Sequence, residues 1–194
     1  MLAYYIKKVI EHGFVGFACV NAPATMAPWG GREKVFGTNP MCVGFPIDER
    51  KTIILDMATS VMAHFKIKVA ALKGEKISEG VALDKQGRPT TDSKEAFEGV
   101  LLPFGGYKGY GLALAIEVLT SALLGAPQSK NIPLHPSTQG EPMDLALSIA
   151  NPVAFVATGM PSPFPPSRRD MPVDSLTMLI SAPGLTKPLR IPSL

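Results

Sequence analysis

Residues 101–111 read LLPFGGYKGYG, and an apolar run over residues 112–124 follows them directly. Glycines let backbone amides approach a ligand closely, and a helix N-terminus adds unsatisfied donors and about half a positive charge. Lys108 adds a full charge, so the stretch suits a phosphate or a carboxylate. A loop-to-helix turn with a solvated lysine is an equal alternative. Because residues 112–124 are apolar nearly all round, they predict a buried helix.

The spacing within this stretch excludes two common nucleotide motifs. A Walker loop requires Gly-Lys-Ser/Thr at the end of a fixed spacing, which is absent here. Gly109 and Gly111 fit the first half of the Rossmann motif GxGxxG, but Leu114 stands where its third glycine belongs. If a nucleotide binds here, we expect a fold other than the ordinary dinucleotide-binding one.

Upstream of this stretch, helix and strand patterns alternate. Helical spacing of apolar residues predicts one helix over residues 2–11. A second helix is predicted over residues 57–71, and the polar region 73–91 predicts a surface excursion. Short apolar runs bounded by turns predict strands over residues 14–21, 41–46 and 52–56. The alternation is typical of the α/β class, with α+β as the alternative, and predicts a mixed β-sheet with packed helices.

Composition changes near residue 127. The chain has 194 residues, 46% apolar and 18% charged, which is enough for a core and excludes a disordered charged tail. Of its 19 prolines, 13 follow residue 126, whereas 15 of its 18 glycines precede residue 127. Proline fixes φ and removes a backbone donor. We therefore expect a packed domain over residues 1–126 and an irregular, proline-rich segment over residues 127–194.

Charge, hydropathy and cysteine content disfavour several classes of function. A net charge of +3 is too small for a nucleic-acid footprint. The most apolar window is too short to span a bilayer and contains Glu117. Cys19 and Cys42 are predicted to be buried free thiols, and with the scattered histidines they form no metal-binding pattern. We expect a cytoplasmic protein without a membrane, nucleic-acid or metal partner.

Two further segments contain candidate site residues. Residues 56–60 read DMATS at the end of a predicted strand, where an acid followed by hydroxyls can contact ribose and phosphate. The alternative, which is favoured on these residues alone, is a helix N-cap cluster. Thr38 and Asn39 lie in the tetrapeptide GTNP, whose side chains can donate to a substrate oxygen or simply form a turn.

Taken together and in order, these segments resemble the malate/L-lactate dehydrogenase family of the non-Rossmann type. The motifs that carry the resemblance are APWGG at 27–31, GTNP at 37–40, DMATS at 56–60, GRPTT at 87–91 and LPFGGYKGYG at 102–111. The resemblance implies an enzyme that uses NAD or NADP to interconvert a 2-hydroxy acid and a 2-oxo acid, or that reduces a cyclic imine carboxylate. It also implies a non-Rossmann nicotinamide-binding domain over residues 1–126, and a homodimer.

The resemblance assigns roles to individual residues. Phe65 stands where the family usually has a glycine, and Ser193 where it has the glycine of a Pro-Gly pair. Residues implied to bind the substrate are Thr38 and Asn39. Residues implied to line the nicotinamide cofactor are Asp56, Met57, Ala58, Thr59, Ser60, Lys66, Tyr107 and Lys108.

No catalytic residue is assigned. The family's proton-donating histidine lies in a Ser-His-Gly segment upstream of the matched region, and His12 belongs to a different turn. We therefore expect the chain to be an N-terminally truncated, cofactor-binding part of such a dehydrogenase. One alternative is a non-catalytic homologue that acts as an assembly or regulatory subunit. Another is an unrelated anion-binding module, which leaves four of the five motifs unexplained.

Overall fold

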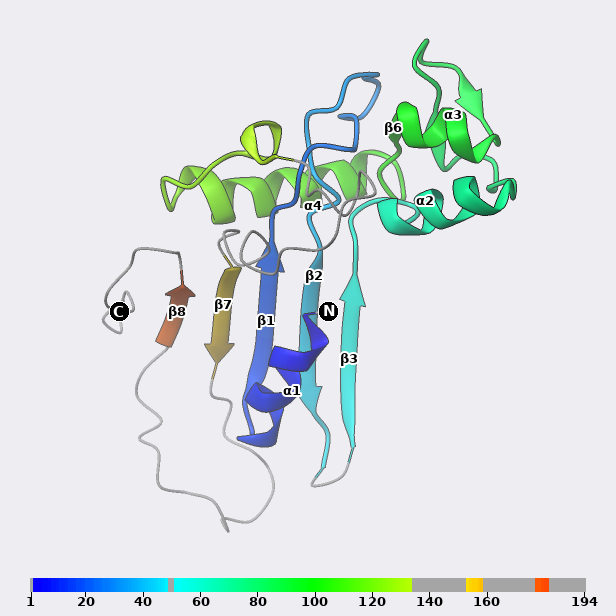
Figure 1. Ribbon diagram of the computed structural model, residues 1–194. Coiled ribbons are helices and arrows are strands. Elements are labelled where there is room, and N and C mark those ends of the chain that lie inside the picture. Colours follow the sequence, from blue (N-terminus) through cyan, green and yellow to red (C-terminus); the bar gives the residue numbers. More distant parts are fainter. Residues whose placement is uncertain (1, 49–50, 134–152, 159–176, 182–194) are drawn as a thin grey trace. The chain divides into compact units, whose positions relative to one another are not determined.

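The computed structural model describes residues 2–48, 51–133, 153–158 and 177–181 (Figure 1). Two compact units alternate along the chain. The first contains residues 2–19 and 41–57 with two later strands, and the second contains residues 20–40 and the described residues from 58 to 133. Most of the proline-rich segment 127–194, including Ser193, lies outside the described residues. Its irregular structure and the boundary at 127 therefore stay predictions.

The first unit is built on a five-stranded sheet of order β3-β2-β1-β7-β8 (Figure 1). Its strands are β1 (Val15–Val20), β2 (Met41–Pro46), β3 (Thr52–Met57), β7 (Val153–Thr158) and β8 (Thr177–Ser181). The pairs β1–β2, β2–β3 and β7–β8 are all antiparallel. The three strands predicted upstream of residue 58 are confirmed, and antiparallel pairing differs from the mostly parallel Rossmann sheet, as expected.

Helix α1 (Ala3–Glu11) packs on this sheet through one apolar face. Ile6 and Ile10, one turn apart, are both buried. A Cβ at Gly44 of β2 would lie 2.3 Å from Cγ2 of Ile6 and 2.5 Å from Cδ1 of Ile10. Any side chain at position 44 would force Ile6 and Ile10 to shift, so glycine lets the helix approach this closely. The helix predicted over residues 2–11 is confirmed.

The two cysteines lie inside the first unit. Cys19 and Cys42 are both buried and free of a disulfide, as predicted. Burial raises the pKa of each thiol to about 11, and for Cys42 the nearby Asp56 carboxylate acts in the same direction. Both thiols are therefore protonated at neutral pH and serve as small apolar residues of the core.

The second unit combines helices with a small antiparallel sheet of order β5-β4-β6. Its elements are α2 (His64–Lys73), β4 (Ala82–Leu83), β5 (Pro89–Thr90), α3 (Ser93–Glu98), β6 (Val100–Leu101), α4 (Tyr107–Glu117), a π-helical turn (Val118–Ala122) and a 3-10 turn (Ser129–Asn131). Its core consists of Met26, Phe36, Ile67, Ile77, Val81, Ala82, Ala96, Leu101 and Ala113. Helices pack beside antiparallel sheets, and this confirms the predicted class of mixed helices and strands.

Two details of the sequence prediction are wrong in this unit. The helix expected from residue 57 begins only at His64, because residues 59–61 instead pair along the segment 102–104. The region 73–91, expected to be a surface excursion, contributes Ile77 and Val81 to the core. Ile77 lies between Lys76 and Ser78, so its neighbours in the sequence conceal this apolar position.

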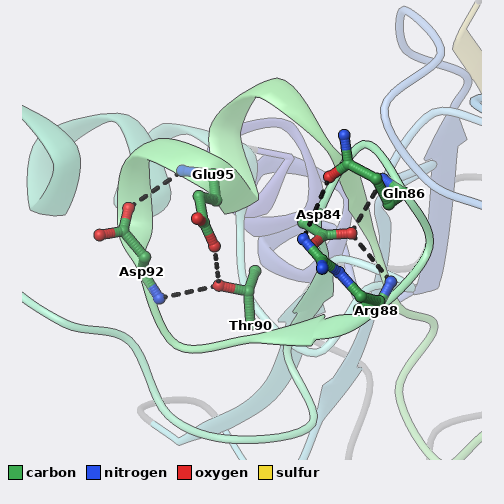
Figure 2. Close-up of polar contacts among 6 residues, drawn as sticks. All are labelled: Asp84, Gln86, Arg88, Thr90, Asp92 and Glu95. Atoms are coloured by element: carbon green, nitrogen blue, oxygen red, sulfur yellow. Dashed lines mark hydrogen bonds and ion pairs between the residues drawn. The ribbon is translucent and has the colours of Figure 1, made fainter.

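Side chains bind the turn before α3 into a fixed shape (Figure 2). The Asp84 carboxylate accepts hydrogen bonds from the amides of Gln86 and Arg88, both at 2.9 Å, and from Nε of Arg88 at 2.8 Å. Asp92 caps α3 by accepting from the amides of Lys94 and Glu95. The motif GRPTT therefore contributes an ordered turn.

His64, the first residue of α2, makes the stability of this unit depend on pH. Its ring stacks on Phe97 with centroids 4.9 Å apart, and burial, followed by Lys34 and Lys68, lowers its pKa below 6.5. A lowered pKa means that the fold favours the neutral imidazole. The neutral His64 imidazole therefore adds to the free energy of unfolding above pH 6.5, and this contribution is lost as the pH falls through the lowered pKa. We expect the free energy of unfolding to decrease between pH 7.5 and pH 5.5.

The matched variant for this measurement is His64→Phe, which keeps an aromatic ring against Phe97 but cannot be protonated. Urea unfolding of both chains at several pH values isolates the contribution of the imidazole. A decrease of equal size in the variant would contradict the prediction.

Candidate functional site

The glycine-rich stretch continues directly into helix α4. The helix begins at Tyr107, ahead of the expected start at residue 112, and a π-helical turn follows it from Val118. Lys108 thus lies in the first turn of a helix rather than in a loop. The helix is not buried all round, since Leu112, Leu114 and Val118 are exposed.

The N-terminus of α4 has the features of an anion-binding site. Gly105 and Gly106 adopt left-handed φ angles of 56° and 66°, which favour glycine. No side chain caps the helix, and its first turn contains no acidic residue. The amides of Tyr107 and Lys108 have no hydrogen-bond acceptor among the described residues. Two unpaired amides and the exposed residue Lys108 therefore lie at the positive end of the helix dipole.

Backbone hydrogen bonds tie the predicted substrate loop to the DMATS segment and to α4. The carbonyl of Thr38 accepts from the amide of Thr59 at 2.9 Å and from its hydroxyl at 3.0 Å. The carbonyl of Thr59 accepts from the amide of Phe104 at 3.0 Å, and the carbonyl of Phe104 accepts from the amide of Gly109 at 3.0 Å. Three segments distant in sequence are therefore joined inside the second unit.

Close packing fixes the junction between these segments. A Cβ at Gly109 would lie 2.2 Å from the Phe104 carbonyl oxygen and 3.0 Å from that of Thr59. Ser60 is also buried and donates its hydroxyl to the carbonyl of Met62 at 2.8 Å. The hydroxyls of Thr59 and Ser60 are thus used within the protein, and neither caps a helix.

The remaining predicted site residues lie elsewhere. Asp56 and Met57 end strand β3 of the first unit, and the Asp56 carboxylate accepts from the amide of Ala3 at 3.0 Å, which satisfies the start of α1. Ala58 is the first residue of the second unit's longer segment. Lys66 is exposed in the first turn of α2, beside Phe65, whose side chain is 69% exposed.

A family model described as malate/L-lactate dehydrogenase matches residues 1–160. The chain belongs to this family. It is 50% identical over 123 residues to the L-sulfolactate dehydrogenase of Methanocaldococcus jannaschii, which covers 63% of the chain and 35% of that relative. It is 43% identical over 121 residues to the Delta(1)-pyrroline-2-carboxylate/Delta(1)-piperideine-2-carboxylate reductase of Pseudomonas putida, covering 62% and 36%.

A solved structure extends the similarity beyond the matched motifs. A dehydrogenase from Sinorhizobium meliloti superimposes with a TM-score of 0.72 at 31% identity, covering 99% of this chain and 54% of that one. The chain spans about a third of the length of the two curated relatives above. The family and its fold are therefore established, and the predicted resemblance is confirmed.

Asn39 differs from the other predicted residues because its side chain is completely buried. It donates to the carbonyl of Ala113 at 3.0 Å and to the Glu117 carboxylate at 2.9 Å, and it accepts from the amide of Ala22 at 3.1 Å. Glu117 and Ser129 complete this polar cluster, and sequence reasoning missed both. A single acid inside an apolar window is the signal that could have identified Glu117.

Neither a metal-binding cluster nor a membrane-spanning helix is present in the part of the chain that the structure describes. Among the described residues, no three His, Cys, Asp or Glu side chains lie close enough together to hold a metal ion. Within the same residues, every helix is too short or too polar to cross a bilayer.

Proposed function

We propose that this chain supplies the cofactor-binding part of a dehydrogenase that interconverts a 2-hydroxy acid and a 2-oxo acid, or reduces a cyclic imine carboxylate, with NAD or NADP. One observation carries the proposal: the uncapped N-terminus of α4, with Lys108, is hydrogen-bonded through Phe104 and Thr59 to the Thr38 carbonyl. An anion site and a candidate substrate loop are thereby held together in one unit. The reaction class is proposed from the two relatives above, which are a sulfolactate dehydrogenase and an imine carboxylate reductase.

The residues at α4 fit the phosphates of a nicotinamide dinucleotide. The amides of Tyr107 and Lys108 would donate to phosphate oxygens, and the Lys108 ammonium would neutralise their charge. Gly105 and Gly106 would let the phosphates approach the backbone. When bound, the nicotinamide supplies the hydride.

The family resemblance assigns contacts with the cofactor to further residues of both units. Asp56, Met57 and Ala58 would line the cofactor along the chain that leaves β3. Thr59 and Ser60 would fix the backbone beside these residues and not contact the cofactor through their hydroxyls, since both hydroxyls are donated to backbone carbonyls. The exposed Lys66 would contact the cofactor from α2.

On the substrate side, we assign direct contact to Thr38 and a supporting role to Asn39. Thr38 would hold the substrate carboxylate, whereas the buried Asn39 amide has protein partners for both of its polar atoms. The proton donor is not assigned to any residue of this chain. A homodimer in the cytoplasm remains part of the proposal on the family resemblance alone.

The chain contains its own reporter for the test. Trp29, the single tryptophan, packs against the N-cap of α4, because a Cβ at Gly106 would lie 2.9 Å from its Cζ3 atom. Reduced nicotinamide absorbs where tryptophan emits, so titration with NADH and with NADPH is expected to quench Trp29 in a saturable manner. Nicotinamide fluorescence, followed in the variant Trp29→Phe, shows whether the indole is only a reporter.

Two outcomes then decide the proposal. Absence of saturable binding of either dinucleotide at high protein concentration would refute it. Binding followed by turnover in a screen of 2-oxo acids would establish the reaction, whereas binding without turnover would favour the assembly or regulatory alternative.

A further inference from the structure

Glu117 is a buried carboxylate that is surrounded by neutral donors. Its side chain lies at the end of α4, and the residue is only 9% exposed. Oε1 accepts from the amide of Ser129 at 2.5 Å, and Oε2 accepts from the Ser129 hydroxyl at 2.6 Å and from Nδ2 of Asn39 at 2.9 Å. Each carboxylate oxygen thus has at least one donor, as a buried charge requires.

The donor pattern at this position distinguishes glutamate from glutamine. A glutamine has one acceptor oxygen and one NH₂ group. With its oxygen toward the Ser129 amide, its NH₂ group would meet the NH₂ of Asn39. In the opposite orientation, its NH₂ group would meet the Ser129 amide. Either arrangement leaves a donor facing a donor, so only the acid satisfies both partners.

The partner of Glu117 holds an unusual backbone conformation. Asn39 is the one non-glycine residue with a positive φ, 24°, among those the structure describes. Asparagine tolerates this region better than most residues, but the conformation persists only where its surroundings determine it. Gly37 in the same loop has no room for a side chain, since a Cβ would lie 2.1 Å from the carbonyl oxygen of Ala22. The buried amide of Asn39 therefore fixes the course of residues 37–40.

This loop returns to the helix that contains Glu117. The Thr38 carbonyl, next to Asn39, accepts both bonds from Thr59. Phe104 then links Thr59 to Gly109 in the first turn of α4. Hydrogen bonds, together with the peptide bond between Thr38 and Asn39, thus form a closed ring. It runs from the last residue of α4, through Asn39 and Thr38, back to the first turn of the same helix.

From this ring we infer that Glu117 is a positioning residue for the substrate: through Asn39 it holds Thr38 where the carboxylate of a 2-oxo acid binds. The inference rests on the proposed function, because it takes Thr38 as the substrate contact. Glu117 itself touches neither substrate nor cofactor. We expect a larger effect on the loop 37–40 than on the amides of Tyr107 and Lys108, because neither amide is hydrogen-bonded within the ring.

The test separates substrate binding from cofactor binding in the full chain. We expect Glu117→Gln to weaken binding of oxamate, an unreactive 2-oxo acid analogue, at least tenfold in the presence of a saturating reduced dinucleotide, which is whichever of NADH and NADPH the wild-type chain binds more tightly. The dissociation constant of that dinucleotide is expected to change less than threefold. Trp29 quenching measures the dinucleotide step, and isothermal titration calorimetry measures the oxamate step.

Two further variants keep the test decisive. Glu79→Gln makes the same chemical change at an exposed glutamate and is expected to leave both constants unchanged. Ser129→Ala removes the hydroxyl but keeps the backbone amide donor, so it covers the case in which Glu117→Gln does not fold. Oxamate binding in Ser129→Ala is expected to weaken by a smaller factor.

The possible outcomes distinguish failure of the positioning role from failure of the proposed function. If the wild-type chain binds both ligands and folded Glu117→Gln binds oxamate equally well, the positioning role is refuted and the proposed function stands. A parallel loss of dinucleotide and oxamate binding in the variants would also refute it, because that indicates a general structural effect. If the wild-type chain binds neither NADH nor NADPH, the proposed function fails and the inference fails with it.

Discussion

Replacement of Gly109 by alanine is expected to lower the free energy of unfolding of the second unit by about 2 kcal/mol or more. The new methyl group would lie 2.2 Å from the Phe104 carbonyl oxygen, 2.9 Å from its nitrogen and 3.0 Å from the Thr59 carbonyl oxygen. All three atoms belong to the backbone, so relief requires the first turn of α4 to move away from its neighbours. The bond from the Gly109 amide to Phe104 would be lost as well.

The same helix provides the control for this substitution. A Cβ at Gly111, two positions along, meets nothing within 4 Å, and the residue is exposed. Alanine is a better helix former than glycine, so Gly111→Ala is expected to stabilise the unit by up to about 1 kcal/mol. Urea unfolding followed by Trp29 fluorescence measures both variants. Equal effects, or a stable Gly109→Ala chain, would contradict the packing described here.

Replacement of Lys108 by glutamate is expected to weaken binding of NADH or NADPH at least tenfold, a loss of about 1.4 kcal/mol or more. The change removes a positive charge and adds a negative one at the helix end where we propose that the phosphates bind. Stability is expected to change in the opposite direction. An acid in the first turn of α4, which has none, interacts favourably with the helix dipole and contributes about 0.3–1 kcal/mol.

A variant that unfolds locally would lose both binding and stability, whereas Lys108→Glu is expected to lose binding and gain stability. The matched control is Lys94→Glu, which makes the same charge change in the first turn of α3, where Asp92 already caps the helix. Its dinucleotide affinity is expected to stay within twofold of the wild-type value. If Lys94→Glu weakens binding as much as Lys108→Glu does, net charge rather than a site at α4 is responsible. The loss for Lys108→Glu is expected to shrink at high salt, because ions screen exposed charges.

Local patterns predicted elements well where a single physical rule acts. The spacing of Ile6 and Ile10 predicted α1, and apolar runs predicted β1, β2 and β3. The start of α4 was predicted too late because Gly109 and Gly111 disfavour a helix when only propensity is considered. In the fold, Gly109 is required by the close approach of the chain at Phe104, and this tertiary contact has no counterpart in the local sequence.

The sequence predicted the candidate site only in part, because local motifs are visible in the sequence and tertiary contacts are not. The resemblance identified the segments around Thr38, Thr59 and Lys108, and the structure joins those three segments by hydrogen bonds. The cluster of Glu117 with Asn39 could not be predicted, because its members are separated by 78 positions. Partner choice over such separations depends on topology, which neither periodicity nor composition specifies.

The alternation of the two units along the chain constrains how this protein can be dissected. The second unit takes Met26 and Phe36 of its core, and the loop with Thr38, from a segment that lies between two strands of the first unit. A fragment that starts at residue 58 would lack those core residues, and a fragment that ends at residue 40 would separate β1 from its partner β2. Neither unit is therefore a module that one cut can release, and recombination at a single crossover point would exchange incomplete cores.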